Sequence, residues 1–224
     1  MISAKLLSIT PNYMEVLKTA CSQPYGKDVT EKSIKKIIES GHLSVLEHCY
    51  ASFLVKCSVR VLGQLTRHRH LSFTCKSARG SVFDTCIIPD GFYTAYAKKH
   101  GITPAEAADE FYAEDDSLLA VYQACIKNGL AEQDAAYFLP QGVETSLVVT
   151  GNFRAWYEYI PKRVCKRAMP EHRELAMAIQ KCLADAAPEI LLLALLFRIV
   201  FYGLIIGGIL GFLYLLMEVF NLGF

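Results

Sequence analysis

The uneven distribution of charge along the chain constrains its fold more than any other feature. Residues 199–217 form a run without a single charged side chain, IVFYGLIIGGILGFLYLLM, within a chain of 224 residues. A helix of about 20 apolar residues is long enough to cross the hydrocarbon core of a bilayer. Because the composition changes at this boundary, we divide the chain into a domain at 1–189 and a hydrophobic C-terminal segment at 190–224.

The apolar run predicts a transmembrane helix that anchors the protein, with membrane contact through 199–217. Two cations, Lys181 and Arg198, precede the run, and only Glu218 follows it, which would keep the large domain on the cytoplasmic side. A buried core helix is an alternative, as is a segment foreign to the domain, such as a fusion or a shifted reading frame. The run repeats the GxxxG spacing, which lets two helices approach closely, at Gly203, Gly207 and Gly211.

Composition excludes several other classes of protein. The chain is 53% hydrophobic and 20% charged, so it is not a disordered chain. Its 23 Lys and Arg residues nearly balance 22 Asp and Glu residues, so no overall basic field binds a nucleic acid polymer. Eight scattered cysteines include no CxxC pair, which favours reduced thiols in a cytoplasmic protein over a disulfide scaffold or a zinc ribbon.

Short strands and helices follow one another without regular alternation. This order predicts an α+β fold, with helices packed on a mainly antiparallel sheet, followed by a C-terminal apolar helix. A capping box with proline at the first helical position marks one helix start, and prolines at 161 and 188 are expected to close two helices. The expected strands are 4–9, 49–56 and 144–150, and the expected helices are 12–21, 31–40, 58–66, 104–128, 131–138, 152–160 and 170–186.

Four of the six histidines lie between residues 42 and 70. A metal site is one interpretation, but no HExxH motif is present, and Arg69 between two imidazoles would oppose the charge of a cation. We therefore predict no metal. A purely structural role, in which a side chain beside a strand satisfies backbone groups, explains His42 or His48 alone.

An anion site is the third interpretation of this region. Arg67-His68-Arg69-His70 is followed by a short segment with two more cations and two serines, and arginine pairs with phosphate through two hydrogen bonds. An exposed charge run is the alternative, although apolar residues at 71 and 73 interrupt it. In the second half, KRVCKRAMPEHR (162–173) carries five cations against one Glu. Upstream, Asn152 and Arg154 could read a pyrimidine or flavin edge, or simply begin a solvated helix.

These residues together resemble a known family. Arg67-His68-Arg69, seven further residues and then Ser77 resemble the signature of the flavin-dependent thymidylate synthases. Gln64, three residues before Arg67, and Ser77-x-Arg79 extend the likeness. Further segments that resemble the family in the same order are GHLSVLEH (41–48), LPQGVETSLVVTGNFR (139–154), Arg163 and ELAMAI (174–179). The resemblance covers residues 1–189 and stops before the apolar run.

The resemblance implies an enzyme that converts dUMP to dTMP by reductive methylation. The one-carbon donor would be 5,10-methylenetetrahydrofolate, and the hydride would come from NADPH through FAD. The family is a homotetramer whose active sites lie between subunits. The enzyme would be cytoplasmic, or anchored to a membrane through its C-terminus.

The same resemblance implies roles for individual residues. Arg163 would be catalytic, because a fixed cation stabilises negative charge that develops on the pyrimidine. Ser77 is a candidate nucleophile without a clear base, so we favour it as a phosphate ligand. FAD is expected near His42, Ser44, Glu47, Arg67, His68, Arg69, His70, Asn152 and Arg154. Substrate is expected near Gln64, Lys76, Ser77, Ala78, Arg79 and Arg163.

The chain departs from the family pattern in several places. AMPEHRE (168–174) stands where the family has Ala-Gln-Trp-Glu-Ile-Arg. Ala136 falls where an Arg helps to hold the nucleotide phosphate, and Lys76 is a candidate substitute. These departures motivate an alternative, a catalytically degenerate, membrane-tethered relative that binds nucleotide or flavin. Other departures are Thr74 for Asn, Gly80 for an aromatic residue, Glu158 for Asn and Arg167 for His.

Overall fold

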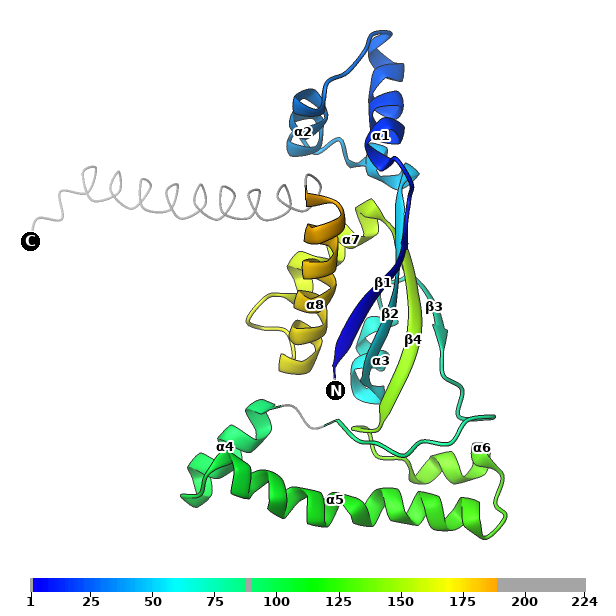
Figure 1. The fold of residues 1–224 in the computed structure, drawn as a ribbon, viewed down its shortest axis with the longest axis vertical. Helices are drawn as coiled ribbons and strands as arrows, with labels where there is room; N and C mark the ends of the chain where they lie inside the picture. The colour runs from blue at the N-terminus through cyan, green and yellow to red at the C-terminus, as the bar shows by residue number, and fades with distance from the viewer. Residues whose placement is uncertain (1, 88–89, 189–224) are drawn as a thin grey trace, which may run out of the picture.

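A four-stranded antiparallel sheet forms the centre of the molecule (Figure 1). The computed structural model describes residues 2–87 and 90–188. The strands, in spatial order, are β1 (Ser3–Ile9), β2 (Tyr50–Ser58), β4 (Glu144–Asn152) and β3 (Ser72–Cys75). Every neighbouring pair is antiparallel. The α+β class and the antiparallel sheet predicted from the sequence are confirmed.

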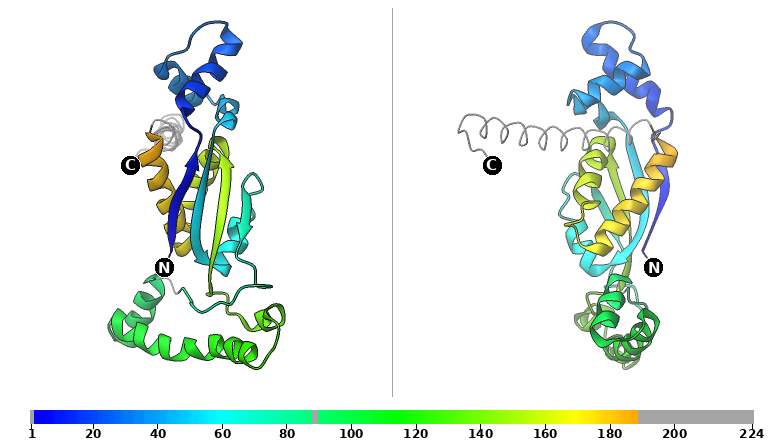
Figure 2. Two further views of the ribbon diagram at one scale, coloured as in Figure 1. Left: turned by 45° about the vertical axis from the view of Figure 1, so that its right-hand side comes forward. Right: turned by 90° about the vertical axis from the view of Figure 1, so that its left-hand side faces the viewer.

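The helices gather in three places (Figures 1 and 2). Helices α1 and α2 extend beyond one end of the sheet, α4, α5 and α6 lie across the other end, and α7 and α8 lie side by side on one sheet face. The helices are α1 (Tyr13–Ser22), α2 (Glu31–Glu39), α3 (Val59–Leu65), α4 (Asp90–His100), α5 (Pro104–Lys127), α6 (Glu132–Ala135), α7 (Phe153–Arg163) and α8 (Pro170–Ala186). Short 3-10 helices occupy Gln23–Tyr25, Leu43–His48 and Ala136–Phe138.

Strand β2 shows why α7 lies where it does. Its alternate residues, such as Phe53, are fully buried, whereas Tyr50 and Leu54 on the opposite face are 42% and 36% exposed. The buried face meets Trp156 of α7, whose ring lies 5.1 Å from that of Phe53 in an edge-to-face arrangement. The Trp156 indole N–H also donates to the carbonyl oxygen of Ala51 at 3.1 Å. Apolar burial and one hydrogen bond therefore fix α7 on the sheet.

Gly151, near the end of β4, leaves room for the side chain of Leu71. A Cβ atom there would lie 2.3 Å from Leu71 Cδ2 and 3.4 Å from both Ala155 and Trp156. No real Cβ tolerates a contact of 2.3 Å, so any larger residue must push the buried Leu71 side chain aside. Glycine at this position therefore keeps Leu71 in its packed position beside Ala155 and Trp156.

One local prediction was wrong, and two elements were missed. Pro161 does not end α7, because it lies in the last turn and displaces only one intrahelical hydrogen bond, so the helix continues to Arg163. The segment 131–138, predicted to be helical, is an α-helix at Glu132–Ala135 and continues as a 3-10 helix at Ala136–Phe138. The sequence also failed to indicate β3, whose four residues are too few for a clear alternation, and α4.

The apolar run at 199–217 lies outside the described residues, as does the predicted C-terminal helix. Among the helices that are described, none is long and apolar enough to cross a bilayer.

Substitution of Gly151 by alanine should lower the free energy of unfolding by about 1–3 kcal/mol, because the new methyl group overpacks the Leu71 and Trp156 contact. Gly63 is the matched control. It is exposed within α3, and a Cβ there would meet no atom within 4 Å. Gly63→Ala should therefore be neutral or stabilise by up to about 1 kcal/mol. Urea unfolding measures the free energy of unfolding of both variants, and equal values for the two would contradict the packing argument.

Candidate active site

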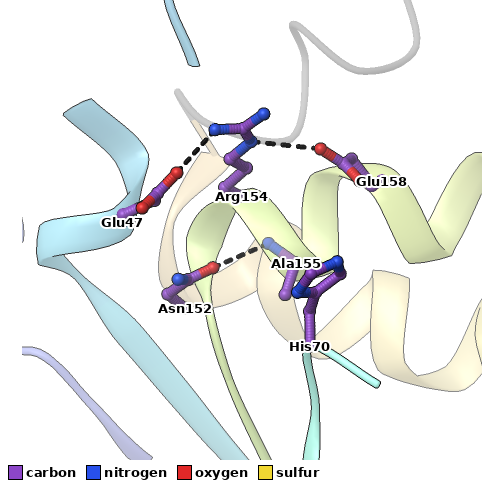
Figure 3. Close-up of a pocket in the computed structure, with 6 residues that line it drawn as sticks. All are labelled: Glu47, His70, Asn152, Arg154, Ala155 and Glu158. Atoms are coloured by element: carbon purple, nitrogen blue, oxygen red, sulfur yellow. Dashed lines mark hydrogen bonds and ion pairs between the residues drawn. The ribbon is translucent and has the colours of Figure 1, made fainter. Parts of the chain in front are cut away.

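A polar cavity of about 300 Å³ opens beside the N-terminal half of α7 (Figure 3). We call it the Arg154 cavity. It gathers residues from the 3-10 turn at 43–48, the segment before β3, and α7 itself. Its lining residues are Glu47, His70, Asn152, Arg154, Ala155 and Glu158. Four of the residues predicted to bind flavin therefore meet at one place, and Ala155 and Glu158 join them.

Arg154 lies between two carboxylates in this cavity (Figure 3). One terminal guanidinium nitrogen donates to Glu47 Oε1, and Nε donates to Glu158 Oε1 at 3.1 Å. The three side chains are 37–46% exposed, so each ion pair contributes little to stability. The pairs instead fix the direction of the guanidinium and compensate its charge.

Asn152 also has a structural role at the start of α7. It is the N-cap of α7, and its Oδ1 accepts a hydrogen bond from the Ala155 backbone N–H at 2.8 Å. The side-chain NH2 group is the part of this amide that remains for a ligand.

A second polar group, the Arg163 cluster, lies at the C-terminal half of α7. It joins the last turns of α7 to α3 and to the first turn of α8. Arg163 Nε donates to His68 Nε2 at 2.8 Å, and the His68 ring packs edge-on against Tyr159 with centroids 4.8 Å apart. His172 lies between the Tyr159 hydroxyl, at 3.1 Å, and Gln64 Oε1, at 3.3 Å. The structure thus brings together Gln64, His68 and Arg163, three residues that the sequence predicted.

His68 is held in one protonation state by this contact. Because a guanidinium only donates, His68 Nε2 must accept, and the imidazole proton lies on Nδ1. Burial and the neighbouring positive charge of Arg163 lower the pKa of His68 to about 4. His68 is therefore neutral near pH 7. It was predicted to bind flavin, and here its Nε2 faces Arg163.

Sequence analysis missed His172, which is completely buried. Burial, followed by the positive charge of Arg163, lowers the pKa of His172 to about 3. The neighbouring Glu171, 2% exposed, accepts hydrogen bonds from the Ser58 backbone N–H at 2.7 Å and the Ser58 hydroxyl at 2.6 Å. Since Ser58 is the N-cap of α3, this carboxylate ties the start of α8 to the start of α3. The only sequence signal was the departure of this segment from the family pattern.

The other residues predicted to bind the substrate phosphate lie in the loop that follows β3. After β3, Lys76 Nζ donates to the Val82 carbonyl at 2.8 Å and lies 4.3 Å from the Phe83 ring centroid. Ser77 Oγ accepts from the Arg79 backbone N–H at 3.2 Å, and both residues are exposed. Ala78 packs at the edge of a small apolar cluster. The side-chain contacts described for this loop do not reach Gln64 or Arg163.

The other predicted flavin ligands lie on the surface. These residues, all exposed, are His42, Ser44, Arg67 and Arg69. Within 2–87 and 90–188, no three His, Cys, Asp or Glu side chains come together as a metal site would require.

Comparison of the sequence with known proteins shows the family of this chain. A family model described as "Thymidylate synthase complementing protein" matches residues 5–189. A flavin-dependent thymidylate synthase of Mycobacteroides abscessus is 35% identical over 194 residues, which cover 80% of this chain and 78% of the relative. Relatives of the same description are 34% identical in Mycobacterium tuberculosis and 35% identical in Mycobacterium avium, each over 196 residues, with the same coverage. The chain belongs to the flavin-dependent thymidylate synthase family.

Acidification should destabilise the fold through His172. Its folded pKa of about 3 lies below the ordinary value of 6.5, so the unfolded chain binds the additional proton. The stability is present above pH 6.5 and is lost as the pH falls toward 3, with a slope of up to about 1.4 kcal/mol per pH unit for this proton. Urea unfolding at pH 7, 5.5 and 4.5 measures the slope, which should be smaller in His172→Ile. An identical slope in both proteins would refute the assignment.

Proposed function

We propose that this chain catalyses the reductive methylation of dUMP to dTMP, with FAD as cofactor, 5,10-methylenetetrahydrofolate as one-carbon donor and NADPH as reductant. The family membership supports this reaction. The observation that carries the proposal is the state of Arg163. Its Nε is fixed by neutral His68, and no carboxylate in the described part of the chain forms an ion pair with it.

Arg163 is suited to stabilise an anionic pyrimidine. With Nε donating to His68, its two terminal nitrogens are the donors that remain for substrate. The charge of Arg154 is compensated by two carboxylates, whereas that of Arg163 is not. A fixed cation beside a carbon that becomes nucleophilic lowers the energy of the charge developing there. Neutral His68 orients this cation and leaves its field unopposed.

The Arg154 cavity fits part of a flavin dinucleotide. Its volume of about 300 Å³ is at the lower limit of small-molecule sites, so it can enclose one portion of FAD while the remainder lies outside. Arg154, the Asn152 NH2 group and His70 supply the polar contacts. Bound flavin would supply hydride transfer, and the protein positions it.

The nucleotide phosphate requires donors, and Gln64 is the candidate that hydrogen bonds connect to the Arg163 cluster, through His172. Lys76, Ser77 and Arg79 belong to a loop whose described side-chain contacts do not reach that cluster. In a homotetramer with sites between subunits, the loop of a second copy could complete the phosphate site. We therefore retain the homotetramer as part of the proposal. The eight free cysteines are compatible with a cytoplasmic location.

A protein that binds ligand without turnover is the second candidate, and Glu158 is the observation that favours it. Its carboxylate competes with any anionic ligand for Arg154. Formation of dTMP by the purified full chain, measured with FAD and the three reactants dUMP, 5,10-methylenetetrahydrofolate and NADPH, would exclude this candidate.

Glu158→Gln should bind FAD a few-fold more tightly than the unmodified chain. The substitution removes one of two carboxylates that hold Arg154, and rim ion pairs of this exposure are weak, so the effect is small. Fluorescence titration with FAD measures it. Weaker binding would show that Glu158 helps the flavin rather than competing with it.

Arg163→Ala should lower turnover by at least about 10²-fold, a loss comparable to removal of one fixed donor at a developing charge. Lys166, exposed in the same basic segment, provides the control, and Lys166→Ala should keep turnover within about twofold. The measurement is the rate of dTMP formation at saturating reactants. Full activity of Arg163→Ala would remove Arg163 from the mechanism.

A further inference from the structure

His172 has no assigned task in the reaction, yet it is the most deeply placed polar side chain of the Arg163 cluster. It is completely buried on the first turn of α8. It connects Tyr159 of α7 to Gln64 of α3 through its two ring nitrogens. Gln64 is the only one of these contacts that the proposed function places on substrate.

The direction of each hydrogen bond in this network follows from the contact between Gln64 and Met169. Gln64 Nε2 lies 3.4 Å from Met169 Sδ, and a thioether sulfur only accepts. The carbonyl oxygen of Gln64 therefore faces His172, and His172 Nδ1 must carry the proton that it donates. His172 Nε2 then accepts from the Tyr159 hydroxyl. The two partners on either side of His172 thus require a single tautomer.

Both residues that contact the Gln64 amide differ from the family pattern given above. In that pattern, Gln occupies position 169 and Ile occupies position 172. Here a weak acceptor stands at 169, and a strong donor stands at 172. The strong polar partner of the Gln64 amide in this chain is therefore the His172 imidazole, because the other contact, Met169, offers only a thioether sulfur.

We propose that His172 is a positioning residue that acts through Gln64, holding its amide with an N–H directed at the phosphate of the nucleotide. The inference rests on the proposed function, because the phosphate is that of dUMP. Gln64 Oε1 is engaged by His172, so the second hydrogen on Nε2 is the group left for an anion. If the amide rotated by 180°, its oxygen would face the phosphate and repel it.

Three substitutions at one position separate this role from packing. His172→Ile restores the family residue, fills the buried site and removes the donor. His172→Asn places an amide nitrogen where Nδ1 was, and so preserves the donor to Gln64. His172→Gln reaches instead toward the position of Nε2 and Tyr159.

The experiment is calorimetric titration of dUMP into the FAD-loaded full chain and each variant. We expect the dUMP Kd of His172→Ile to rise about tenfold or more, as for a lost hydrogen bond to a charged group. His172→Asn should recover most of the affinity, and His172→Gln should recover little. In turnover assays the loss should fall on the KM for dUMP rather than on kcat. Urea unfolding shows whether each variant keeps its fold.

A double-mutant cycle with Gln64→Ala tests whether the effect passes through Gln64. In that background, His172→Ile should change the dUMP Kd by less than about twofold. An undiminished effect there, or an unchanged Kd in the His172→Ile single variant, would overturn the positioning role alone. An unmodified chain that binds FAD but no dUMP would instead overturn the proposed function on which the inference rests.

Discussion

The packing of α7 on the sheet is the interaction on which the rest of the site depends. Trp156 packs its ring against Phe53 and donates a hydrogen bond to the Ala51 carbonyl oxygen. This contact fixes both halves of one helix at once. The first half presents Arg154 to the cavity, and the second half presents Arg163 to the buried cluster. The helix sets the separation between the two predicted ligand sites, and the packing contact fixes the place of both on the sheet.

Arg154 and Arg163, the two arginines of α7, differ in the charges of the groups that surround them. Arg154 is compensated by Glu47 and Glu158 near the surface, whereas Arg163 is partly buried beside a neutral imidazole. His68 and His172 add no charge to the cluster around Arg163, because burial and the positive guanidinium lower the pKa of both imidazoles. A satisfied buried polar network of this kind specifies side-chain directions more than it adds stability. Positioning of donors is what chemistry on an anionic nucleotide requires.

Local patterns predicted much of the fold, because β2, β4 and the capped helices carry clear periodicity and end signals. Comparison with relatives confirmed the family that motif resemblance predicted. The site residues that the resemblance implied stay predictions, and the structure gathers five of them beside α7, namely Gln64, His68, Asn152, Arg154 and Arg163. His172 could not be found in this way. Its contact with Gln64 joins residues 108 positions apart, so it depends on how α8 packs on α3. Ser77 and Arg79 also remain predictions, since the side-chain contacts described for their loop do not reach the Arg163 cluster.

We propose that the Arg154 cavity and the Arg163 cluster are two parts of one site that holds flavin and nucleotide together. The test is the visible absorption spectrum of the purified full chain in mild detergent, reconstituted with FAD and recorded before and after addition of dUMP. We expect a bound-flavin spectrum that shifts on addition of dUMP. A protein that retains no flavin, or a flavin spectrum that saturating dUMP leaves unchanged, would contradict it.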